Sequence, residues 1–403
     1  MGYKLDPACR GKLGYLAGAV DARRIYQNSV EGTQTDLFGT SYLRHFMQVC
    51  ESENRDAVIV TTHECERYDT QLGRFTILNR PRPSGRSLQY HLRQVRWTHD
   101  ILDEMEAHGV GTTVLTAAQH YWLVTLPFRK RGMKFINSYH CSIRSLGHKK
   151  LSLHEVFIRL TSRFHLSHGD PTMVIVPTII QELLKEAGAH KRESIQLLPD
   201  YIQEVFADFS APPISIEPQD IIHVIYAGRI TRNKGVFDIL TVAEELASRR
   251  GPKICFHIHG EGDAFDSLRQ AINISSHGHL VKLYGFTAGL DLKDHYARAD
   301  IVIVPTRSDF DEGIAKSVVE GVLTLRPVVT SKACPSIGIL SDACLEAEVD
   351  NPTSYANAIW RLANEPQLAA LKVRAAANLR LMFFDPSERY DRRLRHALAL
   401  VEA

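Results

Sequence analysis

Two glutamates, Glu312 and Glu320, have a spacing that suggests a binding site. They flank a segment in which apolar residues recur every four positions, as on one face of a helix (Ile314, Val318 and Val322). Residues 299–305 precede them as a short buried-strand pattern. We therefore expect Glu312 in the loop at the mouth of the helix and Glu320 about two turns inside it.

The start of such a helix suits a phosphate, because its unpaired N–H groups and its dipole attract anions. A carboxylate at the same place repels phosphate and is better suited to hydroxyl groups, from which it accepts hydrogen bonds. Together these features indicate a ligand in which phosphate is linked to hydroxyl-rich groups, and a nucleotide sugar fits that description. Considered alone, the two glutamates could be solvated residues of an ordinary helix.

A second stretch places two cations in one loop. Residues 221–227 are a nearly continuous apolar strand pattern, and the loop that follows contains Gly228, Arg229 and Lys234. Arginine offers a planar fork of donors and lysine a compact charge, so both can meet one phosphate group. This loop and the Glu312 loop follow strands, at the edge where open α/β sheets bind ligands. The alternative is a pair of ordinary surface cations.

Two histidines stand at corresponding places in the first half of the chain. His140 follows the strand pattern at 134–138, and His120 follows the pattern at 112–116. Because both lie near the carboxyl ends of expected strands, they are candidates for contact with a ligand. The chain has 19 histidines, so a structural or exposed role is the alternative.

The length of the chain, 403 residues, is too great for one compact core, so two domains are expected. In both halves, strands alternate with helices, which predicts parallel sheets covered on both faces. The proline-rich segment 209–218 separates the halves. In the first half, a polar loop is expected after the strand pattern at 11–20, and a helix from 40 to 50.

Composition excludes several classes of protein. A hydrophobic content of 44% and a charged content of 23% are ordinary for a soluble globular protein, and a net charge of +2 argues against a nucleic-acid binder. The seven cysteines form no Cys-x-x-Cys pair, so neither a zinc site nor a disulfide framework is expected.

No apolar signal core follows Met1, and no window reaches the ~18 apolar residues of a membrane span. The sequence predicts a cytoplasmic protein.

Residues 74–97 contain six arginines and no acidic residue, with aromatic and aliphatic residues between them. Such a segment could contact anionic lipid headgroups, which would place the protein peripherally on a membrane, or it could contact a phosphate-bearing acceptor. A solvated, arginine-rich helix face is the alternative.

Two further patterns predict less than they first suggest. The run from Gly260 to Gly262 resembles the start of a dinucleotide-binding fingerprint, but the third glycine is missing and no acidic residue ends the following strand. Asp309 and Asp311 could hold Mg²⁺, yet two carboxylates alone bind it weakly and nearby cations can neutralise phosphate. Neither a metal nor another cofactor is expected.

Taken in order, these motifs resemble glycosyltransferase family 4, the glycosyl transferases group 1, which are retaining nucleotide-sugar enzymes of GT-B fold. The resemblance covers most of residues 221–335, and the first half of the chain fits more loosely. It rests on residues 225–235, on residues 256–262 with 281–286, and on residues 312–320 with 326–329.

The resemblance implies two doubly wound, Rossmann-like α/β domains that face each other across a cleft. Residues 1–213 would bind the acceptor and residues 214–384 the nucleotide sugar, while residues 385–403 would form a helix that crosses back to the first domain. The implied activity is retaining transfer of a sugar from a UDP- or GDP-sugar to a hydroxyl of a glycan or lipid-linked acceptor. Such enzymes act in cell-surface polysaccharide or glycolipid synthesis and do not require a metal.

The family also implies roles for individual residues. Arg229 and Lys234 would hold the donor diphosphate and stabilise the leaving nucleoside diphosphate. Glu312 would contact hydroxyls of the transferred sugar, and His140 would reach that sugar from the first domain. Gly228 and the amides of Gly313, Ile314 and Ala315 would also contact the donor, and Glu320 would bind its ribose. The candidates for contact with the acceptor are Gly32, Gly39 and His120.

The sequence departs from the family where Ile314 and Ala315 replace an aromatic–glycine pair and where Leu325 replaces a glycine. These changes affect sugar and acceptor geometry more than the diphosphate site. Two alternatives therefore stay open. One is a nucleotide-sugar epimerase or hydrolase of the same fold, and the other is a non-catalytic protein that binds nucleotide sugars.

Overall fold

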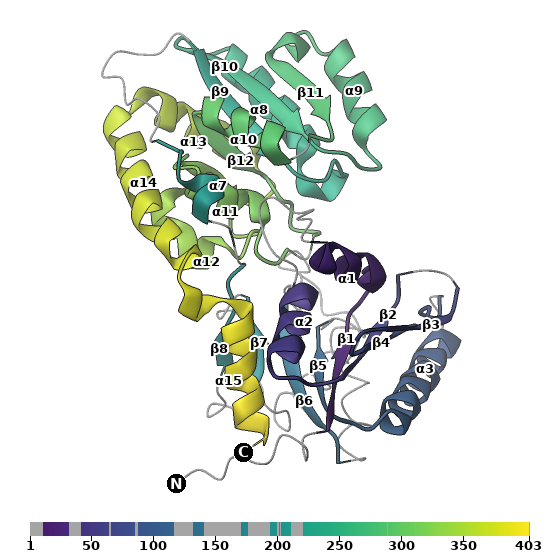
Figure 1. Cartoon of the computed structure of the whole chain (residues 1–403). Helices are drawn as coiled ribbons and strands as arrows, with labels where there is room; N and C mark the ends of the chain where they lie inside the picture. The colour runs from purple at the N-terminus through teal and green to yellow at the C-terminus, as the bar shows by residue number, and fades with distance from the viewer. Residues whose placement is uncertain are drawn as a thin grey trace.

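The structure is a computed structural model that describes residues 11–31, 42–63, 66–84, 88–116, 132–140, 171–175, 194–199, 201, 203–210, 221–287, 289–310 and 312–402. Two β-sheets organise these residues, one in each half of the chain (Figure 1). The chain builds the lower domain of the figure first, then the upper domain, and returns to the lower one at its C-terminal end.

The sheet of the first domain has eight strands in the order β3-β4-β2-β1-β5-β6-β7-β8. All neighbouring strands are parallel except β3 and β4, so the predicted parallel sheet is confirmed with one antiparallel strand at its edge. The sequence did not predict β3, because its polar residues are half-buried or exposed and form no apolar run. The strands are β1 Lys12–Leu16, β2 Ala57–Thr61, β3 Tyr68–Leu72, β4 Phe75–Asn79, β5 Val110–Leu115, β6 Lys134–Tyr139, β7 Thr172–Val174 and β8 Ser194–Gln196.

The sheet of the second domain has six parallel strands in the order β11-β10-β9-β12-β13-β14. The first strand of this domain, β9, lies between β10 and β12, so the strand order reverses there. Such a switch point leaves a crevice at the carboxyl ends of the strands. The strands are β9 Ile221–Ala227, β10 Lys253–His259, β11 Val281–Gly285, β12 Ile301–Val304, β13 Val328–Ser331 and β14 Cys344–Ala347.

Helices cover both sheets, and buried aliphatic and aromatic side chains fill the space between the layers. In the first half, the described helices are α1 Ala22–Val30, α2 Tyr42–Ser52, α3 Leu88–Ala107 and α7 Gln203–Phe206. In the second half, they are α8 Val236–Ala247, α9 Phe265–Ile274, α10 Gly289–Arg298, α11 Lys316–Leu323, α12 Ile337–Leu340, α13 Pro352–Asn364, α14 Pro366–Leu379 and α15 Tyr390–Glu402.

Helix α1 lies where a polar loop was predicted, and that prediction was wrong. Asp21 caps the helix, since its carboxylate accepts a hydrogen bond from the Arg24 amide at 3.0 Å. A cap of this kind satisfies a donor that the first turn leaves free. With one buried residue in the helix, Ala22, the apolar pattern was too weak to reveal it.

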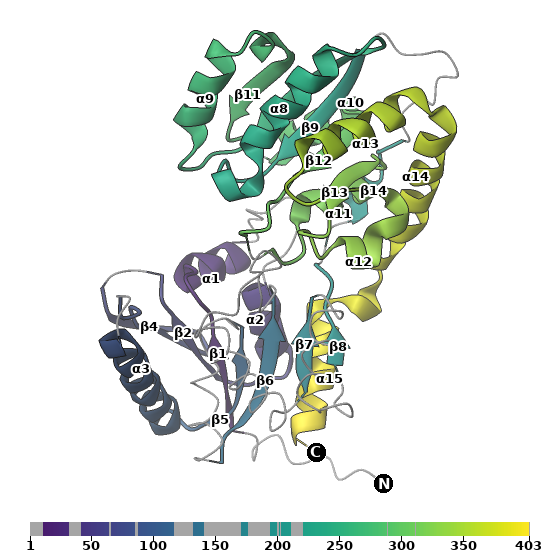
Figure 2. The ribbon, with the colours of Figure 1, turned by 180° about the vertical axis from the view of Figure 1, so that it is seen from behind.

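The C-terminal helix, α15, crosses back to the first domain, as predicted, and begins at Tyr390. It packs on α2, β6 and β7, and lies beside them in both views (Figure 2). Arg55 Nη1 contacts Glu402 Oε1 at 2.8 Å, and Lys134 Nζ donates to the Val401 carbonyl at 2.5 Å. The predicted boundary between residues 213 and 214 lies outside the described residues and stays a prediction.

Part of the arginine-rich segment is used inside the first domain, and contact of residues 74–97 with lipid stays a prediction. Arg80 is 5% exposed and forms ion pairs with Glu104 and Asp69 at 2.5 and 2.6 Å. Arg74 donates to the Asn54 side chain at 2.9 Å. These two side chains are therefore not free to meet lipid. Among the described residues, no helix is both long enough and apolar enough to cross a membrane.

Candidate functional site

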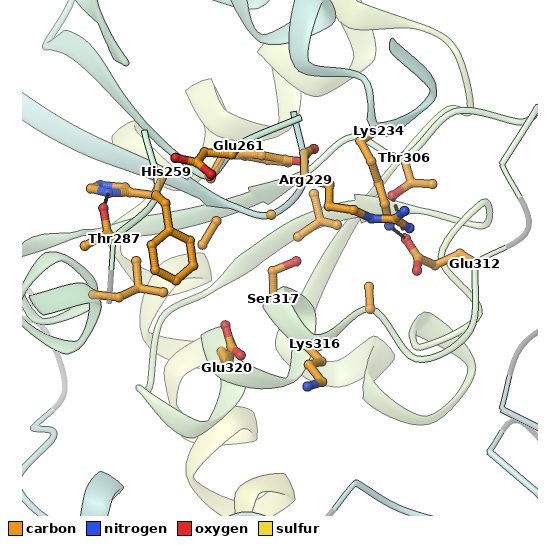
Figure 3. A pocket seen from close by; sticks show the side chains of 18 of the residues that line it. Arg229, Lys234, His259, Glu261, Thr287, Thr306, Glu312, Lys316, Ser317 and Glu320 are labelled. Carbon is orange, nitrogen blue, oxygen red and sulfur yellow. Dashed lines mark hydrogen bonds and ion pairs between the residues drawn. The ribbon is translucent and has the colours of Figure 1, made fainter. Parts of the chain in front are cut away.

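A cavity of about 600 Å³ lies at the carboxyl ends of β9, β10, β11 and β12, where the strand order predicts a crevice (Figure 3). Its size is typical of pockets for small molecules. The residues that line it, within the described chain, all belong to the second domain and lie between Tyr226 and Glu320. Predicted site residues among them are Gly228, Arg229, Lys234, Glu312, Ile314, Ala315 and Glu320.

The loop after β9 carries two of the cations into this cavity. Its backbone is fixed at both ends, because the Gly228 amide donates to the His259 carbonyl at 3.0 Å and the Tyr226 hydroxyl donates to the Arg229 carbonyl at 2.7 Å. Gly235, which ends the loop, has φ 71°, and a Cβ there would lie 1.9 Å from the Pro305 carbonyl oxygen. A larger residue would therefore move Lys234.

Lys234 and Glu312 form an ion pair inside the cavity, with side chains 14% and 9% exposed. Glu312 also accepts a hydrogen bond from the Thr306 hydroxyl at 3.1 Å. The ring of Phe310 lies 4.1 Å from the Lys234 ammonium and 5.5 Å from the Arg229 guanidinium carbon. In Figure 3 the three charged side chains converge on one wall. Arg229 and Lys234 can thus hold an anion beside Glu312, which can accept hydrogen bonds.

Helix α11 begins at Lys316, two residues after Ile314, where the helical pattern of apolar residues begins. The Ala315 amide donates to the Ser336 hydroxyl at 2.9 Å, so it is already occupied. Amides in the first turn of a helix have no acceptor within the helix, and Lys316 and Ser317, which begin α11, line the cavity. The sequence missed these two residues. Gly313 is buried and does not line the cavity.

Glu320 lies at the other end of the cavity and has a buried partner that the sequence did not reveal. The hydroxyl of Tyr296, from α10, donates to Glu320 Oε2 at 2.8 Å. Burial raises the pKa of Glu320, while this hydrogen bond and the charge of Lys316 lower it. The hydrogen bond from Tyr296 thus favours the ionised form of Glu320. The other carboxylate oxygen, Oε1, can still accept hydrogen bonds from hydroxyl groups of a ligand.

His259 forms part of the cavity wall beside Thr287. Its Nδ1 lies 2.8 Å from the Thr287 hydroxyl, and its ring stacks on Tyr284 at 4.4 Å. Burial, together with the charges of His295 and His257, lowers the pKa of His259 to about 3. The imidazole is therefore neutral near pH 7.

The free energy of unfolding is expected to fall as the pH drops below about 6.5, the ordinary pKa of histidine. Burial lowers the pKa of His140 and His259 to about 3 and that of His257 to about 4. Between these values and 6.5 the unfolded chain binds protons that the folded chain does not, so stability present above 6.5 is lost progressively toward pH 4. Urea midpoints at pH 7.5, 6.0 and 5.0 measure the slope.

Replacement of His257 by glutamine should make this dependence shallower, because one of the three groups no longer titrates. The matched control is His279→Gln, at an exposed position outside the cavity. Equal slopes for wild type and His257→Gln would contradict the assignment.

His140, expected to reach the transferred sugar, does not line this cavity. Its Nε2 lies 2.9 Å from the Ser138 hydroxyl, and its ring packs on Tyr42 at 4.1 Å. The remaining first-domain candidates, Gly32, Gly39 and His120, lie outside the described residues. Roles for all four stay predictions.

The two weaker patterns differ in outcome. Gly260 packs against the Gly228 carbonyl, and Gly262 against the Ile230 carbonyl, so this run supports the cation loop. Asp311 lies outside the described residues. Within the described ranges, no three His, Cys, Asp or Glu side chains are grouped closely enough to hold a metal ion.

Solved structures with the same architecture extend over nearly the whole chain. Sucrose-phosphate synthase from Thermosynechococcus elongatus is 15% identical with a TM-score of 0.68, covering 97% of this chain and 98% of that one. HepE from Anabaena, solved with UDP, is 11% identical with a TM-score of 0.65, covering 96% and 99%. These matches, with the two parallel sheets and the returning helix, define a GT-B fold.

Sequence comparison matches the second domain to a known family. Residues 222–365 match the model for glycosyl transferases group 1. TuaC of Bacillus subtilis (strain 168), a protein named for teichuronic acid biosynthesis, is 29% identical over 124 residues. That match covers 31% of this chain and 27% of TuaC, so the chain spans about a quarter of this relative's length.

Proposed function

We propose that the protein is a retaining glycosyltransferase that moves a sugar from a UDP- or GDP-sugar to a hydroxyl of a glycan or lipid-linked acceptor. One observation carries the proposal: Arg229, Lys234 and the start of α11 line the same cavity as Glu312 and Glu320. Cations and helix amides suit a diphosphate, and the carboxylates suit the hydroxyl-rich groups on either side of it.

The diphosphate would lie between the Arg229–Lys234 wall and the start of α11 at Lys316 and Ser317 (Figure 3). As the bond to the sugar breaks, negative charge grows on the leaving nucleoside diphosphate, and these fixed donors stabilise it. Lys234 would exchange its contact with Glu312 for the phosphate, which frees Glu312 to accept hydroxyls of the sugar.

The ribose hydroxyls would meet Glu320, whose carboxylate is held by Tyr296. The base would then lie toward His259 and Thr287. HepE was solved in complex with UDP, which makes UDP the first nucleotide to test here. Closure of the first domain over the cavity would exclude water that otherwise hydrolyses the donor, and would bring the acceptor in.

A panel of UDP- and GDP-sugars, assayed for release of UDP or GDP with and without glycan and lipid-linked acceptors, tests the proposal. We expect release that depends on an acceptor, and a glycosidic product with the donor's anomeric configuration. Fast turnover without acceptor would favour the epimerase or hydrolase alternative. Tight nucleotide binding without turnover on any member of the panel would favour a non-catalytic binding protein.

Replacing Tyr296 by phenylalanine is expected to weaken UDP or GDP binding roughly tenfold, because a hydrogen bond to a charged group is lost. The pKa of Glu320 should rise, so binding should fail at a higher pH than in wild type. Titration calorimetry from pH 5 to 8 measures both changes. Tyr355→Phe, another buried tyrosine outside the cavity, is the control; an unshifted pH midpoint would refute the pairing.

We also infer a cytoplasmic location. In the described part of the chain, Cys50, Cys255, Cys334 and Cys344 are free thiols, as expected in a reducing compartment. Peripheral contact with anionic lipid would have to use arginines other than Arg74 and Arg80.

A further inference from the structure

The cavity contains a third cation that the donor diphosphate does not require. Lys316 begins α11, its side chain is exposed, and it lines the cavity with Ser317. In Figure 3 these two residues lie across the cavity from Arg229 and Lys234. One diphosphate, held by that opposite pair and by the start of α11, leaves the side-chain ammonium of Lys316 without an assigned anionic ligand.

The carboxylates near Lys316 are already engaged. Glu320, one turn further along α11, accepts the Tyr296 hydroxyl at 2.8 Å and is 6% exposed. Its oxygens lie too far from the Lys316 ammonium for an ion pair, although the lysine's charge lowers the Glu320 pKa. Glu312 is paired with Lys234. Lys316 therefore lines the cavity and has no ion-pair partner among the described residues.

We propose that Lys316 is a specificity residue for a second negative charge, a carboxylate or phosphate, on the sugar side of the diphosphate. The inference rests on the proposed function and narrows its substrate class. An unpaired ammonium at the cavity wall attracts a nearby anion, and because the Lys316 side chain is exposed the expected gain is that of a surface ion pair. The charge can belong to the transferred sugar or to the acceptor, and these sources are separable.

Calorimetry with UDP-glucuronate and UDP-glucose tests the donor as the source, with GDP-mannuronate and GDP-mannose used if the protein prefers GDP. We expect the acidic donor to bind about fivefold more tightly, as for one partly exposed ion pair. Lys316→Gln keeps the backbone amide that the proposed function uses, and it should reduce that preference to less than twofold. Lys332→Gln, at an exposed lysine outside the cavity, should leave the preference unchanged.

Glucose 6-phosphate and glucose, titrated into the UDP complex, test the acceptor as the source. A Lys316-dependent preference for the phosphate, with none in the donor comparison, assigns the charge to the acceptor. Binding of UDP-sugars with no Lys316-dependent preference in either comparison overturns this inference alone. No binding of any UDP- or GDP-sugar by the wild type overturns the proposed function, and this inference with it.

Discussion

Replacing Lys234 by alanine should weaken binding of UDP or GDP roughly 100-fold and reduce turnover at least as much. The lysine is largely buried in the cavity and paired with Glu312. Without it, the diphosphate would lie beside an uncompensated carboxylate, and losing one partner of a buried charge pair costs about 3 kcal/mol. Titration calorimetry measures the affinity, and Lys332→Ala is the matched control at an exposed site.

A double variant separates the loss of the lysine contact from the effect of the unpaired Glu312 carboxylate. If half of the loss in affinity comes from that unpaired carboxylate, then Lys234→Ala combined with Glu312→Gln should recover part of the nucleotide affinity. Turnover should stay low, since Glu312 is also proposed to contact the sugar. Unchanged nucleotide affinity in Lys234→Ala would show that the donor binds elsewhere.

Replacing Gly260 by alanine is the second change with a large expected effect. Gly260 has φ 140°, and a Cβ there would lie 1.8 Å from the Gly228 carbonyl oxygen. The backbone beside Arg229 would have to move, so we expect destabilisation of about 3 kcal/mol and loss of nucleotide binding. Urea denaturation and calorimetry measure the two effects.

Gly18→Ala is the matched control, because a Cβ at Gly18 meets no atom within 4 Å. This variant should retain wild-type stability and affinity. If Gly260→Ala folds and binds nucleotide as wild type does, the close approach of the two loops is not needed to position Arg229.

The strands of the second domain could be predicted almost to the residue. The prediction for 221–227 coincides with β9, because a parallel strand buried on both faces is a nearly continuous apolar run. The loops after such strands must meet at one edge of the sheet, and for this reason the order of motifs along the chain is enough to group Arg229, Lys234 and Glu312.

What the sequence could not predict depends on contacts between distant segments. The late start of α11 coincides with a hydrogen bond from the Ala315 amide to Ser336, 21 residues away. Tyr296 and Glu320 are 24 residues apart, and no local pattern connects them. Arg80 belonged to an arginine-rich run, yet the fold buries it against Glu104 and Asp69. In each case tertiary packing, which local propensity does not encode, decides the outcome.

A crystal structure with an intact nucleotide sugar tests the central claim most directly. It should show the diphosphate bound by Arg229, Lys234 and the first amides of α11, with the ribose on Glu320 and the sugar beside Glu312. A nucleotide sugar bound outside this cavity, or with its diphosphate away from Arg229 and Lys234, would contradict the account.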